Sequence, residues 1–292
     1  MFTCTFATAS HHSVFLPTQV VLPKALQLCL MSVLHVPTSS LDCKYVINVV
    51  DTRVFALLNI SLIVQSTMSH DTPFGELLNL NYVSPAAAIH TIERNRNVIL
   101  DLKVRLSKNI AGQNDLKVLG LAKEAAAAIK LPLMVHIGDS HSPVEKILEL
   151  LGNGDVLTHT FHGRERGILD AKGRVIPAVR KAVDRGVRLD VGHGAGSFSF
   201  DVCEKALKQD VIPGTISSDL HQYNVHGSMF DLATTLSKFM HLSLTLDQIS
   251  TPPPTRPTHS ASLKAWERCA RAPKPTLRCS RRSKATSSSS TR

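Results

Sequence analysis

Four residues whose types suit a metal site stand within or just after separate short apolar runs. Lys103 lies inside the run 98–104, His136 lies in 133–137, and His159 lies in 156–161. Asp219 follows the run 212–217. Two imidazoles and a carboxylate are ligands for a hard or borderline divalent cation. If the fold brings the ends of these runs together, the four residues predict a divalent-metal site.

Each of these residues also has a structural interpretation when it is taken alone. A histidine that ends a buried strand is more often a hydrogen-bonded core residue than a ligand. A lysine in a strand usually extends its ammonium group to solvent or pairs with a carboxylate. The occurrence of four such residues in four separate runs, in chain order, favours the metal site.

The elements that must position these residues alternate regularly along the chain. Short apolar, β-branched runs occur at residues 54–60, 98–104, 133–137, 156–161, 187–191 and 212–217. Helical spacing separates them at residues 86–97, 115–130, 143–151, 177–185, 200–209 and 229–240. Six successive βα units predict an α/β fold with a parallel sheet, either doubly wound or a (β/α)8 barrel. In a barrel the carboxyl ends of the strands converge on one mouth, so the four residues would become neighbours.

Two of the helices carry start signals. Ser84 precedes Pro85, which is a preferred residue for the first position of a helix. Ser142 and Glu145 have the spacing of a capping box. We therefore expect Ser84 and Ser142 to be N-caps.

Composition separates the body of the chain from its two ends. The 292 residues carry a formal charge of +10, but residues 251–292 hold ten of the 33 Lys and Arg and only one of the 23 acids. The first 250 residues therefore carry +1, which removes the main argument for a nucleic-acid partner. Residues 251–292 form a basic tail rich in Pro and Ser that is predicted to be disordered. Residues 1–46 form an atypical N-terminal segment that is predicted to be poorly ordered.

Other counts limit the class of protein. With 43% hydrophobic residues the chain has enough apolar side chains for a buried core, and no run of eighteen apolar residues predicts a membrane span. Between residues 44 and 250 there is a single cysteine, Cys203, as is typical of a reducing compartment. We therefore expect a cytoplasmic protein with no membrane partner. The sequence leaves a homo-oligomer open.

Several longer motifs add a family resemblance over residues 47–250. The order of strand lysine, two strand histidines and strand aspartate resembles that of the amidohydrolase superfamily. The local sequence motifs resemble those of its dihydroorotase-like amidohydrolase/deacetylase branch. The motifs are Asn59-Ile-Ser, Gly75-Glu-Leu-Leu, Leu102-Lys-Val-Arg-Leu-Ser, Met134-Val-His-Ile-Gly, Leu157-Thr-His-Thr-Phe-His-Gly, Asp190-Val-Gly-His-Gly-Ala-Gly-Ser-Phe-Ser-Phe, Ser217-Ser-Asp-Leu-His and Thr235-Leu-Ser-Lys-Phe.

The resemblance implies a TIM-type (β/α)8 metal-dependent hydrolase barrel with zinc at its mouth. Lys103 would be N-carboxylated and bridge two metals, since a free ammonium cannot be a ligand. His136 and His159 would hold the second metal, and Asp219 would bind the first and act as general base. Arg105 and His193 would bind the substrate. The implied reaction cleaves an amide or ester bond of a small acylated amino or hydroxy acid.

The sequence departs from this family at the first metal. The family has an H-x-H motif at the end of its first strand, and this sequence contains no H-x-H. The six runs correspond to barrel strands 3–8, so the barrel is expected to be incomplete and the two-metal site is in question. The alternative function is a catalytically impaired or inactive fragment of the family, truncated or carrying misassigned ends.

Overall fold

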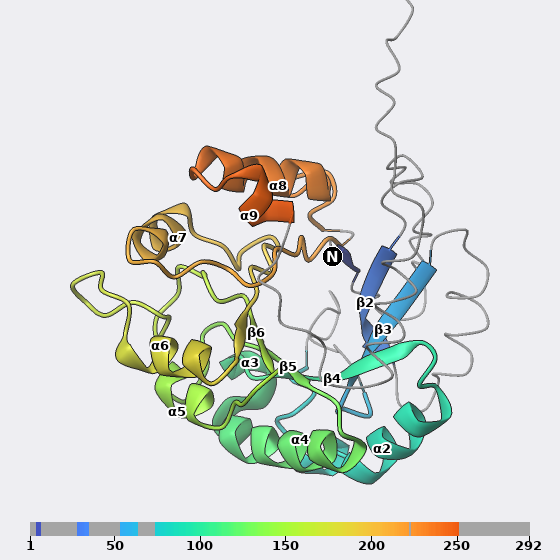
Figure 1. The fold of residues 1–292 in the computed structure, drawn as a ribbon. Coiled ribbons are helices and arrows are strands. Elements are labelled where there is room, and N and C mark those ends of the chain that lie inside the picture. Colours follow the sequence, from blue (N-terminus) through green and yellow to red (C-terminus); the bar gives the residue numbers. More distant parts are fainter. Residues whose placement is uncertain (1–3, 7–27, 35–52, 64–73, 222, 251–292) are drawn as a thin grey trace, which may run out of the picture.

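The computed structural model describes residues 4–6, 28–34, 53–63, 74–221 and 223–250. Their strands form one seven-stranded sheet in which each strand pairs in parallel with the next along the chain (Figure 1). The strands are β1 (Cys4–Phe6), β2 (Leu28–Leu34), β3 (Arg53–Asn59), β4 (Ile99–Arg105), β5 (Leu133–His136), β6 (Val156–Thr158) and β7 (Arg188–Leu189).

Helices follow most of the strands and cover one side of the sheet. Figure 1 shows α2, α4, α5 and α6 along the outer side of the curved sheet, with α7, α8 and α9 continuing the series. The α-helices are α2 (Pro85–Arg94), α3 (Lys108–Ala111), α4 (Asp115–Ile129), α5 (Val144–Glu149), α6 (Pro177–Asp184), α7 (Phe200–Leu207), α8 (Leu232–His241) and α9 (Leu246–Ser250). Two single 3-10 turns, η4 (Leu80–Tyr82) and η5 (Gly112–Asn114), precede α2 and α4.

The predicted α/β architecture is confirmed, and five of the six predicted strands correspond to β3–β7. The prediction of a strand over 212–217 is wrong, because this segment forms no strand and has only isolated bridge residues, Thr215, which pairs with Asp190, and Ser217. Pro213 has no N–H to donate, and the N–H groups of Gly214 and Thr215 both bond to the carbonyl of Leu189. The even register of a parallel ladder is therefore lost at this position.

The N-terminal segment contributes two strands that the sequence did not predict, β1 and β2. Among the described residues the order of paired strands runs from β1 to β7 and does not close, as expected for an incomplete barrel. The rest of the segment 1–46, and the whole predicted tail 251–292, lie outside the described residues.

The two predicted N-caps have different outcomes. The Ser84 hydroxyl accepts a hydrogen bond from the Ala87 N–H at 3.3 Å, so this cap is confirmed. The capping box at Ser142 is wrong, because the N-cap of α5 is Pro143. Ser142 instead donates from its N–H and its hydroxyl to the buried carboxylate of Asp115, at 2.6 and 2.8 Å. A buried carboxylate needs such donors more than a helix end that water can reach.

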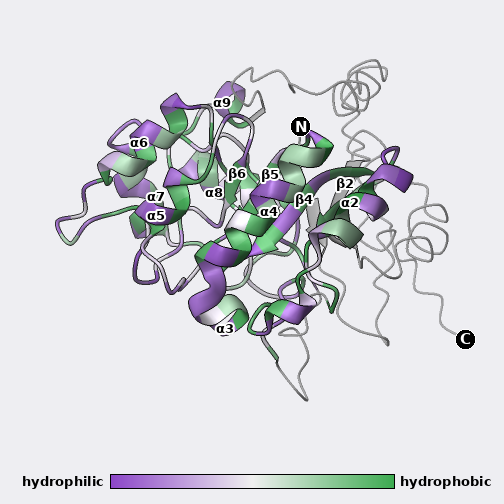
Figure 2. Ribbon diagram, turned by 90° about the horizontal axis from the view of Figure 1, so that it is seen from below, coloured by the Kyte–Doolittle hydropathy of each residue, from purple (hydrophilic) through white to green (hydrophobic). Residues whose placement is uncertain are grey.

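The pleat of β4 directs alternate side chains to the core beneath the helices and to the opposite face of the sheet. Leu102 and Val104 are fully buried in the core cluster shared with Leu119 and Ala122 of α4. Successive residues of a strand point to opposite faces, so Lys103 and Arg105 share the other face. Figure 2 shows hydrophobic and hydrophilic residues alternating along the helices, as expected when one side of each helix packs on the sheet.

In the part of the chain that the structure describes, no helix has both the length and the apolar character needed to cross a bilayer.

Candidate metal centre

Three of the four predicted ligands lie at the carboxyl ends of three adjacent strands. Lys103 is in the second half of β4, His136 is the last residue of β5, and His159 directly follows β6. The strand register places Arg105 beside His136, and His136 beside Thr158. Because the strands are parallel and neighbouring, the side chains meet at one edge of the sheet.

The two histidine rings face each other edge to face. His159 Nε2 lies 2.9 Å from His136 Nδ1, and the ring centroids are 4.3 Å apart at an interplanar angle of 81°. His159 Nδ1 lies 2.5 Å from the carbonyl oxygen of Gly192. A carbonyl only accepts, so Nδ1 of His159 carries the proton and the lone pair stands on Nε2. That lone pair points at His136.

The second nitrogen of His136 has a partner that suits either tautomer. His136 Nε2 lies 3.1 Å from the Ser107 hydroxyl, which can donate or accept. With the proton on Nε2, Nδ1 of His136 presents its own lone pair towards His159. The two rings can therefore offer two converging nitrogen ligands without losing their outer hydrogen bonds.

Burial keeps both imidazoles neutral, which is the form that binds a metal. Burial lowers the pKa of His136 well below its usual value, and the neighbouring His159, Arg105 and Lys103 lower it further. Burial also lowers the pKa of His159, although the carboxylate of Asp219 opposes the shift.

Lys103 is 3% exposed and lies within the same electrostatic environment. Burial lowers the pKa of its ammonium group to about 8, against the opposing charge of Asp219. About a tenth of this side chain is therefore a neutral amine at pH 7, far more than for an ordinary lysine. The charge of Asp219 acts on both Lys103 and His159, so this carboxylate lies in the same electrostatic environment, and its role as a ligand stays a prediction.

Arg105 and His193, the expected substrate-binding residues, both have partners within the protein. Arg105 Nη1 donates to Glu76 Oε1 at 2.7 Å, in a pair whose side chains are 8% and 0% exposed. His193 Nε2 lies 3.0 Å from the Lys238 ammonium group, and its Nδ1 donates to the Gly194 carbonyl at 2.9 Å. Their substrate-binding role stays a prediction.

Comparisons with known proteins agree with this geometry. No protein-family model matches the chain. It is 32% identical to a deacetylase of Agrobacterium fabrum over 206 residues and 37% identical to a deacetylase of Enterococcus faecalis over 190 residues. These alignments cover 70% and 64% of this chain and 50% of each relative, so the chain spans about half the length of the curated relatives it matches.

Solved structures extend the comparison to the fold. A dihydroorotase superposes with a TM-score of 0.71 at 28% identity, covering 81% of this chain and 62% of that one. An adenine deaminase superposes with a TM-score of 0.75, also at 28% identity, covering 85% and 67%. This chain belongs to the amidohydrolase superfamily. The family resemblance and the TIM-type barrel, incomplete in the described residues, are therefore confirmed.

The donor set of this amidohydrolase fits one cation better than two. Among the residues that the structure describes, no three His, Cys, Asp or Glu side chains form a group able to hold a metal ion. The converging nitrogens of His136 and His159 supply two ligands, and Lys103 could supply a third only as a carbamate. The two further histidine ligands expected by the family are absent from the sequence, which contains no H-x-H.

Sequence reasoning missed Asp190 as part of this centre. Its buried carboxylate accepts hydrogen bonds from the hydroxyls of Thr158, Thr215 and Ser217 at 2.6, 2.6 and 2.7 Å. Thr158 precedes one predicted ligand and Ser217 lies two residues before another. The signal available in the sequence is an acid near the end of an apolar run, Asp190 in 187–191, which is also the first residue of a longer family motif.

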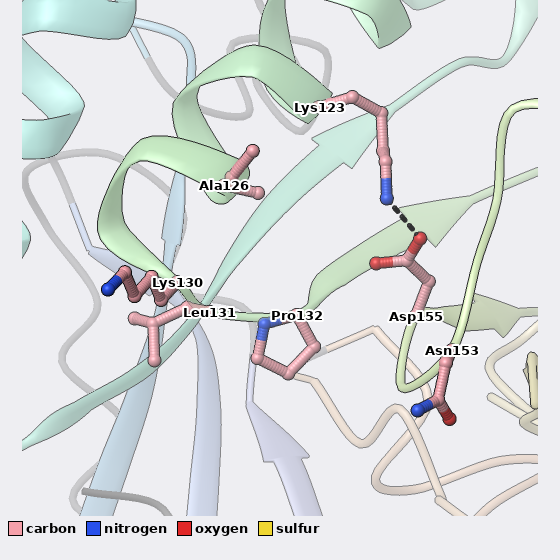
Figure 3. A pocket seen from close by; sticks show the side chains of 8 residues that line it. Lys123, Ala126, Lys130, Leu131, Pro132, Asn153 and Asp155 are labelled. Carbon is pink, nitrogen blue, oxygen red and sulfur yellow. Dashed lines mark hydrogen bonds and ion pairs between the residues drawn. The ribbon is translucent and has the colours of Figure 1, made fainter. Parts of the chain in front are cut away.

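A hollow lies at the end of the strands opposite the candidate metal centre. Figure 3 shows this cleft of about 280 Å³, lined by residues that precede β5 and β6, among them Lys130, Pro132 and Asn153. The Lys123 ammonium group pairs there with Asp155, which also accepts from the Leu133 N–H at 3.0 Å. These contacts hold the beginnings of two strands together, so we assign them a structural role.

Proposed function

We propose that this amidohydrolase is a metal-dependent hydrolase of the deacetylase type. It cleaves an amide or ester bond of a small acylated amino or hydroxy acid. The observation that carries the proposal is the pair of facing nitrogens, His136 Nδ1 and His159 Nε2, 2.9 Å apart beside the buried Lys103. The relatives named deacetylases support the reaction class.

In this proposal Lys103, His136 and His159 hold one divalent cation, zinc being the best match to the donor set. The neutral amine of Lys103 adds to CO2 and releases a proton, which converts the side chain into an anionic carbamate ligand. When bound, the cation polarises a carbonyl group and lowers the pKa of water.

The chain's own residues perform the remaining steps. Asp219 accepts the proton of the attacking water as general base, because among the carboxylates that act on Lys103 and His159 it has the largest effect, whereas Asp190 is engaged by three hydroxyls. Arg105 and His193 orient the substrate, and a cation such as Arg105 suits the carboxylate of an acylated acid. The proposed enzyme is cytoplasmic, in keeping with Cys203, a buried free thiol whose pKa burial raises to about 12.

A catalytically impaired member of the superfamily is the second candidate. The observation that favours it is the donor set itself, which lacks the H-x-H ligands and consists, among the described residues, of His136, His159, Lys103 and Asp219. In this case the chain would retain the fold and one cation without turnover.

Acetate release from a panel of N-acetylated amino acids and O-acetylated hydroxy acids tests the proposal. The purified protein is incubated with zinc and bicarbonate, and the Asp219→Asn variant is the control. We expect turnover by the wild-type chain that falls by two or more orders of magnitude in the variant. Equal, background-level release by both proteins would contradict the proposal and favour the second candidate.

A further inference from the structure

We propose that Asp190 is a positioning residue that fixes the ring and the proton of His159. The proposal concerns a residue that touches neither the facing nitrogens nor the substrate, and it acts through Ser217 and Gly192. It rests on the proposed function for the value of a fixed His159, but its geometry can be tested without a metal.

The carboxylate of Asp190 is the centre of a closed hydrogen-bond network. It is 1% exposed and accepts from three hydroxyls that belong to separate parts of the chain. Thr158 Oγ1 and Ser217 Oγ donate to Oδ2 at 2.6 and 2.7 Å, and Thr215 Oγ1 donates to Oδ1 at 2.6 Å. Three short bonds from hydroxyls provide partners for both oxygens of the buried carboxylate and hold β6, β7 and the segment 215–217 together.

One of these hydroxyls continues the network to the histidine. Ser217 Oγ, having donated to Asp190, accepts a hydrogen bond from the Gly192 N–H at 3.0 Å. The carbonyl oxygen of the same glycine lies 2.5 Å from His159 Nδ1. Asp190 therefore sets the direction of the Ser217 hydroxyl, and Ser217 sets the position of the Gly192 peptide.

The backbone at Gly192 is built for this contact. Its φ of 50° lies in the left-handed region that favours glycine. A Cβ added there would meet Thr158 Oγ1 and would stand 2.6 Å from His159 Nδ1. Only glycine allows the carbonyl and the imidazole to approach so closely.

The consequence concerns the tautomer of His159. A carbonyl held against Nδ1 requires the proton on that nitrogen and leaves Nε2 free to be a ligand. If the peptide of residue 192 can rotate, the proton moves to Nε2 in part of the population and the ligand nitrogen is blocked.

Thr215 provides a matched control for this network. Thr215→Val and Ser217→Ala each remove one short hydroxyl bond to Asp190, but only Ser217 is also bonded to Gly192. If Asp190 serves stability alone, the two variants behave alike. If it positions His159, only Ser217→Ala disturbs the histidine.

The first readout is the imidazole tautomer, measured by ¹⁵N NMR on histidine-labelled, metal-free protein. We expect the wild-type chain and Thr215→Val to keep His159 protonated on Nδ1, and Ser217→Ala and Asp190→Asn to show a mixture. The free energy of unfolding of each variant, from urea titration, confirms that the chains compared are folded. A Thr215→Val spectrum shifted as much as that of Ser217→Ala, or no shift in Ser217→Ala and Asp190→Asn, would overturn the proposal.

The second readout is zinc affinity, measured by competition with a chelator. Loss of an outer-shell partner typically weakens metal binding 10–100-fold, so we expect a loss of about 10-fold or more in Ser217→Ala and less than about 3-fold in Thr215→Val. Equal losses would overturn the proposal. Absence of zinc binding by the wild-type chain would refute the proposed function instead, and the tautomer spectrum would still decide the role of Asp190.

Discussion

Substitution of Arg105 by methionine removes one partner of the most deeply buried ion pair among the described residues. Arg105 Nη1 donates to Glu76 Oε1 at 2.7 Å, and the two side chains are 8% and 0% exposed. Arg105→Met keeps much of the side-chain length but leaves the Glu76 carboxylate without its cation. The second oxygen of Glu76 accepts no hydrogen bond from the described residues, so no other donor there replaces Arg105.

The size of the effect follows from this burial. Breaking a buried pair by removing one partner costs about 3–5 kcal/mol, because a charge is left in a medium that does not solvate it. We expect Arg105→Met to lower the free energy of unfolding by that amount in urea titration. Adding Glu76→Gln should recover about 2 kcal/mol, since the uncompensated charge is then gone.

An exposed pair provides the control. Lys208 and Glu204 of α7 are 2.7 Å apart, but their side chains are 70% and 54% exposed. Pairs of this kind contribute about 0.3–0.5 kcal/mol, so Lys208→Met should change the stability by less than about 1 kcal/mol. If Arg105→Met changed the free energy of unfolding as little as Lys208→Met, burial would not make the Arg105–Glu76 pair important for stability, and this prediction would be refuted.

Three further predictions test the local structure. Burial lowers the pKa of His162 from 6.5 to about 4, so the stability of the folded chain should fall as the pH drops from about 6.5 to 4. In urea titrations at several pH values, His162→Gln should make this fall smaller by on the order of 3 kcal/mol. Gly192→Ala should cost more than about 2 kcal/mol of folding stability, because of its positive φ and its contact with His159. Gly120→Ala, in α4 with open space around it, should stabilise the protein by about 0.5–1 kcal/mol. Thermal unfolding of both variants distinguishes strain from a general glycine effect. Ser84→Ala should cost about 1 kcal/mol through the lost cap of α2, and an unchanged melting temperature would contradict the cap.

The sequence predicted the strands best where apolar runs are continuous. The runs that became β3–β6 pair in the expected order, and the C-terminal position of their polar residues was enough to place Lys103, His136 and His159 together. The strand predicted at 212–217 failed because Pro213 has no N–H for the ladder and the N–H groups of Gly214 and Thr215 compete for one carbonyl, that of Leu189. Apolar character alone does not reveal such competition.

Long-range side-chain contacts explain what could not be predicted. Ser142 has the spacing of a cap, but the need of the buried Asp115, 27 positions earlier, decides its partner. The network around Asp190 joins hydroxyls 25 to 32 positions away, and no local pattern records it. Both depend on which loops the folded chain brings into contact.

The central claim, that Lys103, His136 and His159 form a site for one divalent cation, is tested most directly by zinc titration. Isothermal calorimetry on the metal-free chain, in the presence of bicarbonate, should give one zinc per chain. His136→Ala and His159→Ala should each abolish this binding, since each removes one of the two facing nitrogens. Two zinc ions per chain, no zinc at all, or zinc binding that survives in both His136→Ala and His159→Ala would contradict the account.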